Sequence, residues 1–203
     1  MFLLIAKIFG INRLKVGTDG PGVTTLVGMY KCPLNCEYCI NNPITKYEEY
    51  SVEDLYDAVS IDDLYFNYTG GGICFGGHEA MLQQQFILEF IKYIRKMKHK
   101  WKIGIETCFN CKVNKEVVDA LDYIIIDIKS MDNDIYKSYT ERPNDTLISN
   151  LKEFVQYSKK IFIRVPIIPG YNDYSDVEKS IAQLIEIGYN KDQIKEFTYI
   201  TEL

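Results

Sequence analysis

The amino-acid sequence predicts an α/β protein whose parallel sheet stays open at one side. Short apolar runs that are typical of buried strands alternate with longer segments whose apolar residues recur at helical spacing. Strands and helices that alternate in this way favour right-handed βαβ units and a parallel sheet. The six strand–helix steps are fewer than the eight that close a TIM barrel. The expected fold is therefore an open, partial (β/α)6 TIM-like barrel.

Each element expected in the N-terminal half has its own local signal. The apolar start Met1–Phe9 is too short to span a bilayer and predicts a buried strand. Asp19–Gly22 reads DGPG and predicts a turn, because Pro presets φ and Gly permits a positive φ. The apolar run Thr24–Tyr30 predicts the first central strand. A capping box predicts a helix that begins after Ser51. A short apolar run between glycines predicts a strand over Ile73–Phe75, and about four turns of helical periodicity predict a helix over Leu82–Ile94.

The alternation continues to the end of the chain. Asn114 is expected to cap one helix at its start and Gly188 to end another. Because no linker or low-complexity segment interrupts the pattern, residues 1–203 are expected to form a single domain. The remaining expected strands are Lys102–Glu106, Tyr123–Ile128, Ile161–Ile167 and Phe197–Ile200, and the remaining helices are Lys115–Leu121, Leu147–Val155 and Asp176–Ile187.

Composition narrows the class of protein. The hydrophobic content of 47% and charged content of 25% are ordinary for a globular protein. A net charge of −5 argues against a nucleic-acid partner. The six cysteines include a tight trio rather than a disulfide framework, which favours a reducing compartment. With no signal peptide and no membrane span, the expected location is the cytoplasm, with no membrane partner.

The cysteine trio carries the most specific chemistry in the sequence. Cys32, Cys36 and Cys39 have C-x3-C-x2-C spacing within one loop, directly after the first central strand. A [4Fe–4S] cluster usually takes four thiolates, so a loop that supplies three leaves one iron open to another ligand. The alternative is a zinc site completed by a distant fourth ligand. Candidates for that ligand are Cys74, Cys108, Cys111, His78 and His99.

Polar residues also follow the later strands, where ligands bind in parallel α/β sheets. They include the segment Gly76–Glu79, the pair Glu106 and Thr107, and the stretch Asp127–Lys129. A phosphate-binding P-loop is not predicted, because no G-K-[ST] follows the glycines. Asp127 and Lys129 face the same side of their strand and could equally form a plain surface pair. Arg164 is more telling, because a buried arginine in an apolar strand is rarely unpaired.

Taken together, these motifs resemble the radical SAM (S-adenosylmethionine) superfamily. Within it, they resemble the glycyl-radical-enzyme activating enzymes, typified by the pyruvate formate-lyase activating enzyme. The segments that carry the resemblance are DGPGVTTLVGMYKCPLNCEYCINNP, TGGGICFGGHEAMLQ, IDIK and IRVPIIPGYND. They extend over nearly the whole chain. The resemblance implies the open radical SAM barrel, a [4Fe–4S] cluster and SAM as cofactors.

The resemblance also implies roles for single residues. Cys32, Cys36 and Cys39 would hold the cluster, Gly76 and Gly77 would let the backbone approach SAM, and Glu79 would accept from its ammonium. Lys129 would face the SAM carboxylate, and Arg164 would point toward SAM from its strand. Tyr38 would pack near the adenine, and Glu106, Thr107 and Asp127 would hold a monovalent cation. Three positions depart from the family pattern, with His78 in place of a glycine and Ile40 and Thr201 in place of histidines.

The activity implied is anaerobic reductive cleavage of SAM to a 5′-deoxyadenosyl radical, which takes hydrogen from a glycine of a partner glycyl-radical enzyme. A flavodoxin or ferredoxin would donate the electron. The partner's loop would enter over the cysteine loop, flanked by Pro43–Tyr50 and Gly170–Tyr174. One alternative is a radical SAM enzyme for a small molecule or peptide, such as a 7-carboxy-7-deazaguanine synthase-like or peptide-modifying enzyme. A more remote alternative is a zinc-binding module without catalysis.

Overall fold

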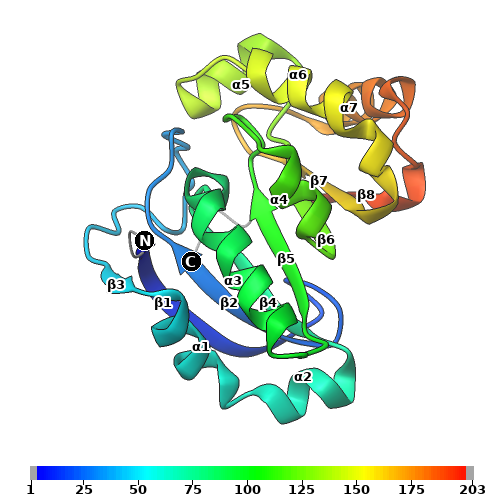
Figure 1. Ribbon diagram of the computed structural model, residues 1–203. Coiled ribbons are helices and arrows are strands. Elements are labelled where there is room, and N and C mark those ends of the chain that lie inside the picture. Colours follow the sequence, from blue (N-terminus) through cyan, green and yellow to red (C-terminus); the bar gives the residue numbers. More distant parts are fainter. Residues whose placement is uncertain (1–3, 200–203) are drawn as a thin grey trace. The chain divides into compact units, whose positions relative to one another are not determined.

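The computed structural model describes residues 4–199, and Figure 1 shows the arrangement of its helices and strands. The described strands form one eight-stranded sheet in the order β3-β1-β2-β4-β5-β6-β7-β8. Its strands are β1 (Ala6–Val16), β2 (Val23–Met29), β3 (Glu48–Tyr50), β4 (Gly72–Gly77), β5 (Lys102–Thr107), β6 (Tyr123–Asp127), β7 (Ile161–Ile167) and β8 (Ile194–Thr198).

The helices alternate with the strands from β4 onward. The α-helices are α1 (Val52–Ser60), α2 (Asp63–Thr69), α3 (Gln84–Lys96), α4 (Lys115–Ala120), α5 (Asn133–Thr140), α6 (Asp145–Phe154) and α7 (Tyr174–Ile187). Three short 3-10 helices are η1 (Ala80–Gln83), η2 (Val155–Lys160) and η3 (Lys191–Gln193). None of these described helices is both long and apolar enough to cross a membrane.

The open α/β fold predicted from the sequence is confirmed. Strands β2 and β4, β4 and β5, and β7 and β8 pair in parallel, and the order of the described strands ends at β3 and β8 without closing. The sequence did not predict that β1 runs antiparallel to both β2 and β3. The parallel sheet thus begins at β2, and β1 covers the outer edge of that strand.

The chain divides into two compact units. The first consists of Met1–Cys32, Pro43–Glu106 and Val113–Ile124. The second consists of Pro33–Asn42, Thr107–Lys112 and Ile125–Leu203. Each unit has its own buried apolar residues.

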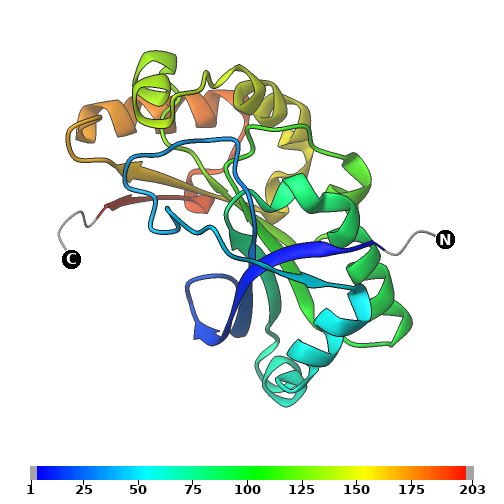
Figure 2. The same cartoon turned by 90° about the vertical axis from the view of Figure 1, so that its left-hand side faces the viewer.

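In the first unit, helix α3 shows how the apolar pattern produces packing. Its residues Phe86, Ile87, Phe90, Ile91 and Ile94 recur at helical spacing and are buried. The Phe90 ring meets Phe75 of β4 edge to face, with 5.5 Å between ring centroids. Helix α3 also neighbours α1 and α4 (Figures 1 and 2). These helices therefore bury the apolar face of the first unit's strands.

The predicted helix ends are confirmed. Ser51 and Asp54 form the expected capping box at the start of α1, and the Asn114 side chain accepts from the Glu116 N–H at the start of α4. Gly188 ends α7 with a φ of 119°, in the left-handed region that favours glycine.

Some predicted boundaries were wrong. The first strand begins at Ala6 rather than Met1 and continues to Val16, because its pairing with β2 extends the strand beyond the apolar run. Residues 1–3 lie outside the described residues. The last strand is Ile194–Thr198 rather than Phe197–Ile200, and Ile200 lies outside the described residues. The elements β3, α2 and α5 were not predicted, because each is short.

A close approach between β5 and β6 fixes a buried tyrosine in the first unit. Tyr123 is 5% exposed, and its hydroxyl donates to the Asp19 carbonyl at 2.8 Å. Gly104 of β5 leaves the space for its ring, because a Cβ on Gly104 would lie 2.1 Å from the nearest ring atom. The turn that precedes β2 is therefore held by a tyrosine that only a glycine at position 104 can accommodate.

We expect Gly104→Ala to lower the free energy of unfolding by about 1–3 kcal/mol, the usual cost of overpacking a core. The measurement is urea unfolding, with the midpoint shifted and the slope unchanged. Gly10→Ala is the matched control, because nothing lies within 4 Å of a Cβ at Gly10 of β1 and its change should stay within about 0.5 kcal/mol. Equal midpoints for the two variants would contradict the proposed role of the close approach.

Candidate functional site

The three predicted cluster ligands follow strand β2. Cys32 closes the first segment of the first unit, while Cys36 and Cys39 lie in the segment Pro33–Asn42 of the second. All three are half-buried, and none of them forms a disulfide within the described part of the chain. Such thiols remain accessible to an incoming metal, unlike Cys74, which is buried in β4.

Hydrogen bonds to its backbone hold the part of the cysteine loop that belongs to the second unit. The Asn35 N–H donates to the Thr140 carbonyl at 3.0 Å, and the Arg142 Nε donates to the Pro33 carbonyl at 3.2 Å. The Cys39 N–H donates to the Cys36 carbonyl at 3.3 Å, which closes a tight turn between the two thiols. The C-terminal end of α5 therefore anchors this loop.

Lys129 is a buried cation just beyond β6. Its side chain is 10% exposed, and its Nζ donates to the Tyr199 hydroxyl at 2.7 Å and lies 3.5 Å from Asp127 Oδ2. Burial by itself lowers the pKa of Lys129, but the Asp127 carboxylate, the Tyr199 hydroxyl and the Cys36 sulfur outweigh it and raise the pKa well above its usual value. Lys129 thus stays protonated and presents a fixed positive charge.

Asp127, at the end of β6, has an unsatisfied oxygen. Its Oδ1 atom is buried and has no hydrogen-bond partner among the described residues. Buried carboxylate oxygens are normally satisfied by a donor or a cation. The carboxyl end of β6 therefore offers one buried ammonium and one acceptor that a ligand or ion could satisfy.

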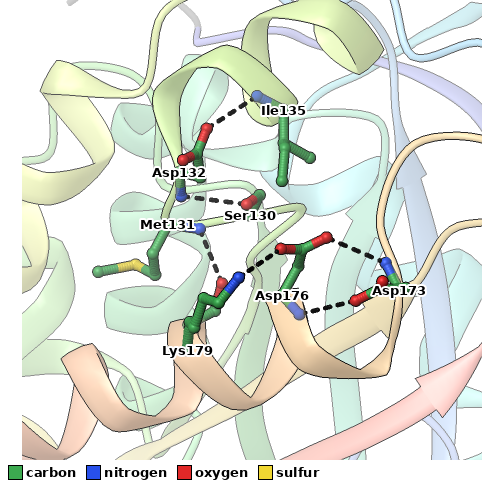
Figure 3. A network of polar contacts seen from close by, with 8 residues as sticks. Ser130, Met131, Asp132, Ile135, Asp173, Asp176 and Lys179 are labelled. Carbon is green, nitrogen blue, oxygen red and sulfur yellow. Dashed lines mark hydrogen bonds and ion pairs between the residues drawn. The ribbon is translucent and has the colours of Figure 1, made fainter.

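The loop after Lys129 is fastened to two helices of the second unit, as Figure 3 shows. The Ser130 hydroxyl accepts from the Asp132 N–H, and Asp132 in turn caps α5 by accepting from the Ile135 N–H. The Met131 N–H donates at 3.1 Å to the Ser180 hydroxyl of α7. The start of α7 is itself held by a capping box of Asp173 and Asp176 and by an ion pair of Asp176 with Lys179. This network fixes the backbone that carries Lys129.

Tyr38, predicted near the adenine, lies in a tyrosine cluster of the second unit. Its ring is 6.1 Å from that of Tyr139 and 6.2 Å from that of Tyr171. The Tyr171 hydroxyl donates to the Glu37 carboxylate, which raises the pKa of Tyr171 to about 12. Tyr38, which lies between Cys36 and Cys39 in the sequence, thus packs against two other tyrosine rings.

In the first unit, the glycine-rich segment ends at a buried carboxylate. Glu79 is 1% exposed, and its Oε1 accepts from the Met81 N–H at 2.9 Å, which caps η1. Gly77 has a φ of +85°, and a Cβ there would lie 2.5 Å from the Phe9 ring. His78 also packs against Phe9, at 5.0 Å between ring centroids, and its Nδ1 accepts from the Lys31 N–H. The fold itself therefore requires glycine at position 77.

The other predicted residues lie in the same two units. A Cβ on Gly76 would come within 3.1 Å of Glu106, so these two touch in the first unit. In the second, Thr107 is buried and its hydroxyl accepts from the Phe109 N–H at 2.8 Å. The Arg164 carbonyl accepts from the N–H of Ile128, the residue before Lys129.

Among the candidates for a fourth zinc ligand, Cys74 is buried and the two histidines make hydrogen bonds, whereas the thiols of Cys108 and Cys111 are half-buried. His99 meets Asp63 Oδ1 at 3.0 Å and the Tyr56 hydroxyl at 3.1 Å. The loop with Cys108 and Cys111 is held by Asn150, which donates to the carbonyl of Cys111. Over residues 4–199, no three His, Cys, Asp or Glu side chains are gathered closely enough to hold a metal ion.

The contact of Tyr199 with Lys129 was missed by sequence reasoning. The family pattern has a histidine at the position that corresponds to Thr201, and Thr201 lies outside the described residues. Tyr199 follows the end of β8 and bonds to the Lys129 ammonium. Its place at the carboxyl end of the last strand was the signal that could have identified it.

Comparison with known proteins identifies the family to which this chain belongs. The sequence profile of the Radical SAM superfamily matches residues 26–184, well over half of the chain. The chain therefore belongs to the radical SAM superfamily and is a radical SAM enzyme.

Its curated relatives include several activating enzymes. The pyruvate formate-lyase-activating enzyme of Clostridium pasteurianum is 27% identical, over 98% of this chain and 84% of the relative. The (2S)-3-sulfopropanediol dehydratase activating enzyme of Klebsiella oxytoca is 26% identical, over 82% of this chain and 72% of the relative. Within its superfamily, the chain thus resembles activating enzymes in sequence.

Solved structures support the fold alone. SuiB of Streptococcus suis, bound to S-adenosylmethionine, has a TM-score of 0.63 and 15% identity. The match covers 83% of this chain but only 38% of SuiB. TYW1 with a lysine-pyruvate adduct has a TM-score of 0.57 and 16% identity, over 87% of this chain and 65% of TYW1.

The residues present fit the cofactors that the superfamily implies. Three half-buried cysteine thiols are the donor type that iron–sulfur clusters take. In the second unit, the buried Lys129 ammonium is a donor that suits a carboxylate. In the first unit, the buried Glu79 side chain is an acceptor that suits an ammonium. The fit rests on the chemistry of these donors.

We expect Ser180→Ala to lower the free energy of unfolding by about 1–3 kcal/mol, because it leaves the buried Met131 N–H without its acceptor. Urea unfolding measures this change, and hydrogen exchange at the Met131 amide should accelerate. Ser138→Ala is the control, because the Ser138 hydroxyl makes an exposed bond to the Ile135 carbonyl within α5. Unchanged exchange at Met131 would contradict the anchoring of this loop.

Proposed function

We propose that this protein activates a partner glycyl-radical enzyme by means of a [4Fe–4S] cluster and S-adenosylmethionine. The observation that carries the proposal is the C-x3-C-x2-C loop in a chain of the radical SAM superfamily. Similarity to a pyruvate formate-lyase-activating enzyme over 98% of the chain supports the activating type. The resemblance noted in the motifs points to the same group.

The cluster ligands would be Cys32, Cys36 and Cys39. Three thiolates leave one iron of a cube without a protein ligand, which is the position that SAM would take. When bound, the reduced cluster supplies one electron that breaks the C5′–S bond of SAM, giving methionine and a 5′-deoxyadenosyl radical that takes a hydrogen atom from a glycine Cα of the partner. The protein positions these groups and excludes quenching side reactions.

The buried charges would orient the amino-acid part of SAM. Lys129 would donate to its carboxylate, with Arg164 directed to the same group. Glu79 would accept a charge-assisted hydrogen bond from its ammonium. Both Lys129 and Glu79 are held by neighbouring polar groups before any ligand binds, so binding would lose little of their side-chain freedom.

The remaining predicted residues would complete the binding surface. Gly76 and Gly77 would allow the backbone to approach SAM, and Tyr38 would pack near the adenine. A monovalent cation would lie against Glu106, Thr107 and Asp127. The unsatisfied Oδ1 of Asp127 supports a ligand or ion at that residue.

A protein segment is the proposed substrate. A loop of the partner would enter over the cysteine loop, flanked by Pro43–Tyr50 and Gly170–Tyr174. Tyr47 and Tyr174 in these segments are 38% and 54% exposed, and aromatic residues are enriched in interface cores. A flavodoxin or ferredoxin would supply the electron, in the cytoplasm and without oxygen.

We expect anaerobically reconstituted protein to hold about four Fe and four sulfide per chain, as one cube requires. Changing Cys32, Cys36 or Cys39 to Ala should abolish cluster binding, as measured by iron and sulfide content and by the EPR signal of the reduced protein. Cys111→Ala is the matched control, a half-buried thiol outside the loop that should leave iron content unchanged. Zinc without iron or sulfide would instead support the non-catalytic zinc module.

The activation step is tested with a glycyl-radical enzyme from the same genome, starting with the one encoded nearest. Reduced protein, SAM and this partner should give an EPR doublet from the glycyl radical, together with 5′-deoxyadenosine. The doublet should collapse when the partner's target Gly is changed to Ala. Deoxyadenosine that forms only with a small metabolite or a short peptide would reject activation in favour of that alternative radical SAM activity.

A further inference from the structure

We propose that Tyr199 is a positioning residue that holds the Lys129 ammonium toward the carboxylate of SAM. The inference rests on the proposed function, because it takes Lys129 as the group that meets this carboxylate. It adds a residue that neither the motifs nor the comparisons assign.

The geometry around Lys129 singles out Tyr199. The Nζ–Oη distance of 2.7 Å is that of a strong hydrogen bond, whereas the contact with Asp127 Oδ2 is 3.5 Å long. The Tyr199 ring centroid is 5.4 Å from Nζ, so the ammonium lies beyond the hydroxyl rather than over the face of the ring. Tyr199 therefore contacts the ammonium through its hydroxyl.

A lysine needs such a contact more than most residues do. Its long, flexible side chain has many rotamers, and a ligand would otherwise have to restrict them on binding. An ammonium has three N–H donors, and its described contacts with Tyr199 and Asp127 engage two of them. The third can donate to a carboxylate while Tyr199 keeps the side chain in place.

Tyr199 is itself firmly placed within the second unit. Its backbone N–H donates to the Ile167 carbonyl at 3.0 Å, which continues the parallel pairing of β7 and β8 beyond Thr198. Its ring packs against that of Phe197, at 5.5 Å between centroids, and lies 6.4 Å from that of Tyr139. Tyr199, just after the end of β8, thus helps to fix the position of the Lys129 ammonium, just after the end of β6.

The test compares two ligands that differ only in the carboxylate. We expect Tyr199→Phe, reconstituted anaerobically, to bind SAM on the order of tenfold more weakly, because a hydrogen bond to a charged group contributes at least about 1.5 kcal/mol and 1.4 kcal/mol is a factor of ten. Its affinity for decarboxylated SAM should match that of the wild type. Iron and sulfide content should also be unchanged, which shows that the cluster loop is intact.

Tyr189→Phe is the matched control. Tyr189 is a buried tyrosine of the same unit, and its hydroxyl donates to the Leu151 carbonyl at 2.9 Å. Losing that hydroxyl should cost stability without changing the affinity for SAM. In the background of Lys129→Met, the Tyr199→Phe change should have no further effect on SAM binding, because the two side chains act through one contact.

Two results would overturn the inference while leaving the proposed function intact. One is a Tyr199→Phe variant that binds SAM as tightly as the wild type. The other is a variant that loses affinity equally for SAM and decarboxylated SAM, which would indicate a general structural role. Failure of the proposed function would appear in the wild type instead, as reconstituted protein that binds no SAM, and would overturn the inference with it.

Discussion

The arrangement at the carboxyl end of β6 depends on one buried positive charge. Moving an ammonium out of water costs several kcal/mol even in a relaxed protein interior, unless nearby groups offset the loss. For Lys129, the Asp127 carboxylate and the Tyr199 hydroxyl provide that compensation. The loop that follows is held to α5 and α7, so the charge sits on a rigid backbone. The hydrogen bonds of this loop to α5 and α7 therefore help to keep Lys129 in place.

The first unit carries the opposite charge under similar constraint. Glu79 is almost fully buried, and its carboxylate caps η1 by accepting from the Met81 N–H. The glycine before this segment has a left-handed backbone and lies against the Phe9 ring, so the chain can turn only with glycine there. Glu79 is thus fixed through a short-range backbone contact, whereas Lys129 in the second unit is fixed by two side chains, those of Asp127 and Tyr199.

Sequence reasoning succeeded where the signal is local. The strand Ile161–Ile167 and the capping box at Ser51 follow from apolar patterning and cap chemistry within a few residues. It failed where the outcome depends on distant pairing. The Tyr199 contact requires the end of β8 to lie near the residue two after β6, a register that no local pattern encodes. The close approach of Phe9 to Gly77 likewise depends on the antiparallel strand β1, because a Cβ on Gly77 would lie 2.5 Å from the Phe9 ring.

Stability alone does not explain the groups at the end of β6. Buried ion pairs often contribute little to stability, and well-packed apolar residues of similar volume can replace them without loss. Asp127 adds a second cost, because its buried Oδ1 lacks a partner among the described residues. These two costs lie two residues apart at the carboxyl end of one strand, and groups that cost stability cluster at functional sites. This energetic argument supports the proposed role of Asp127 and Lys129 in ligand recognition, and it does not depend on the sequence motif that first suggested that role.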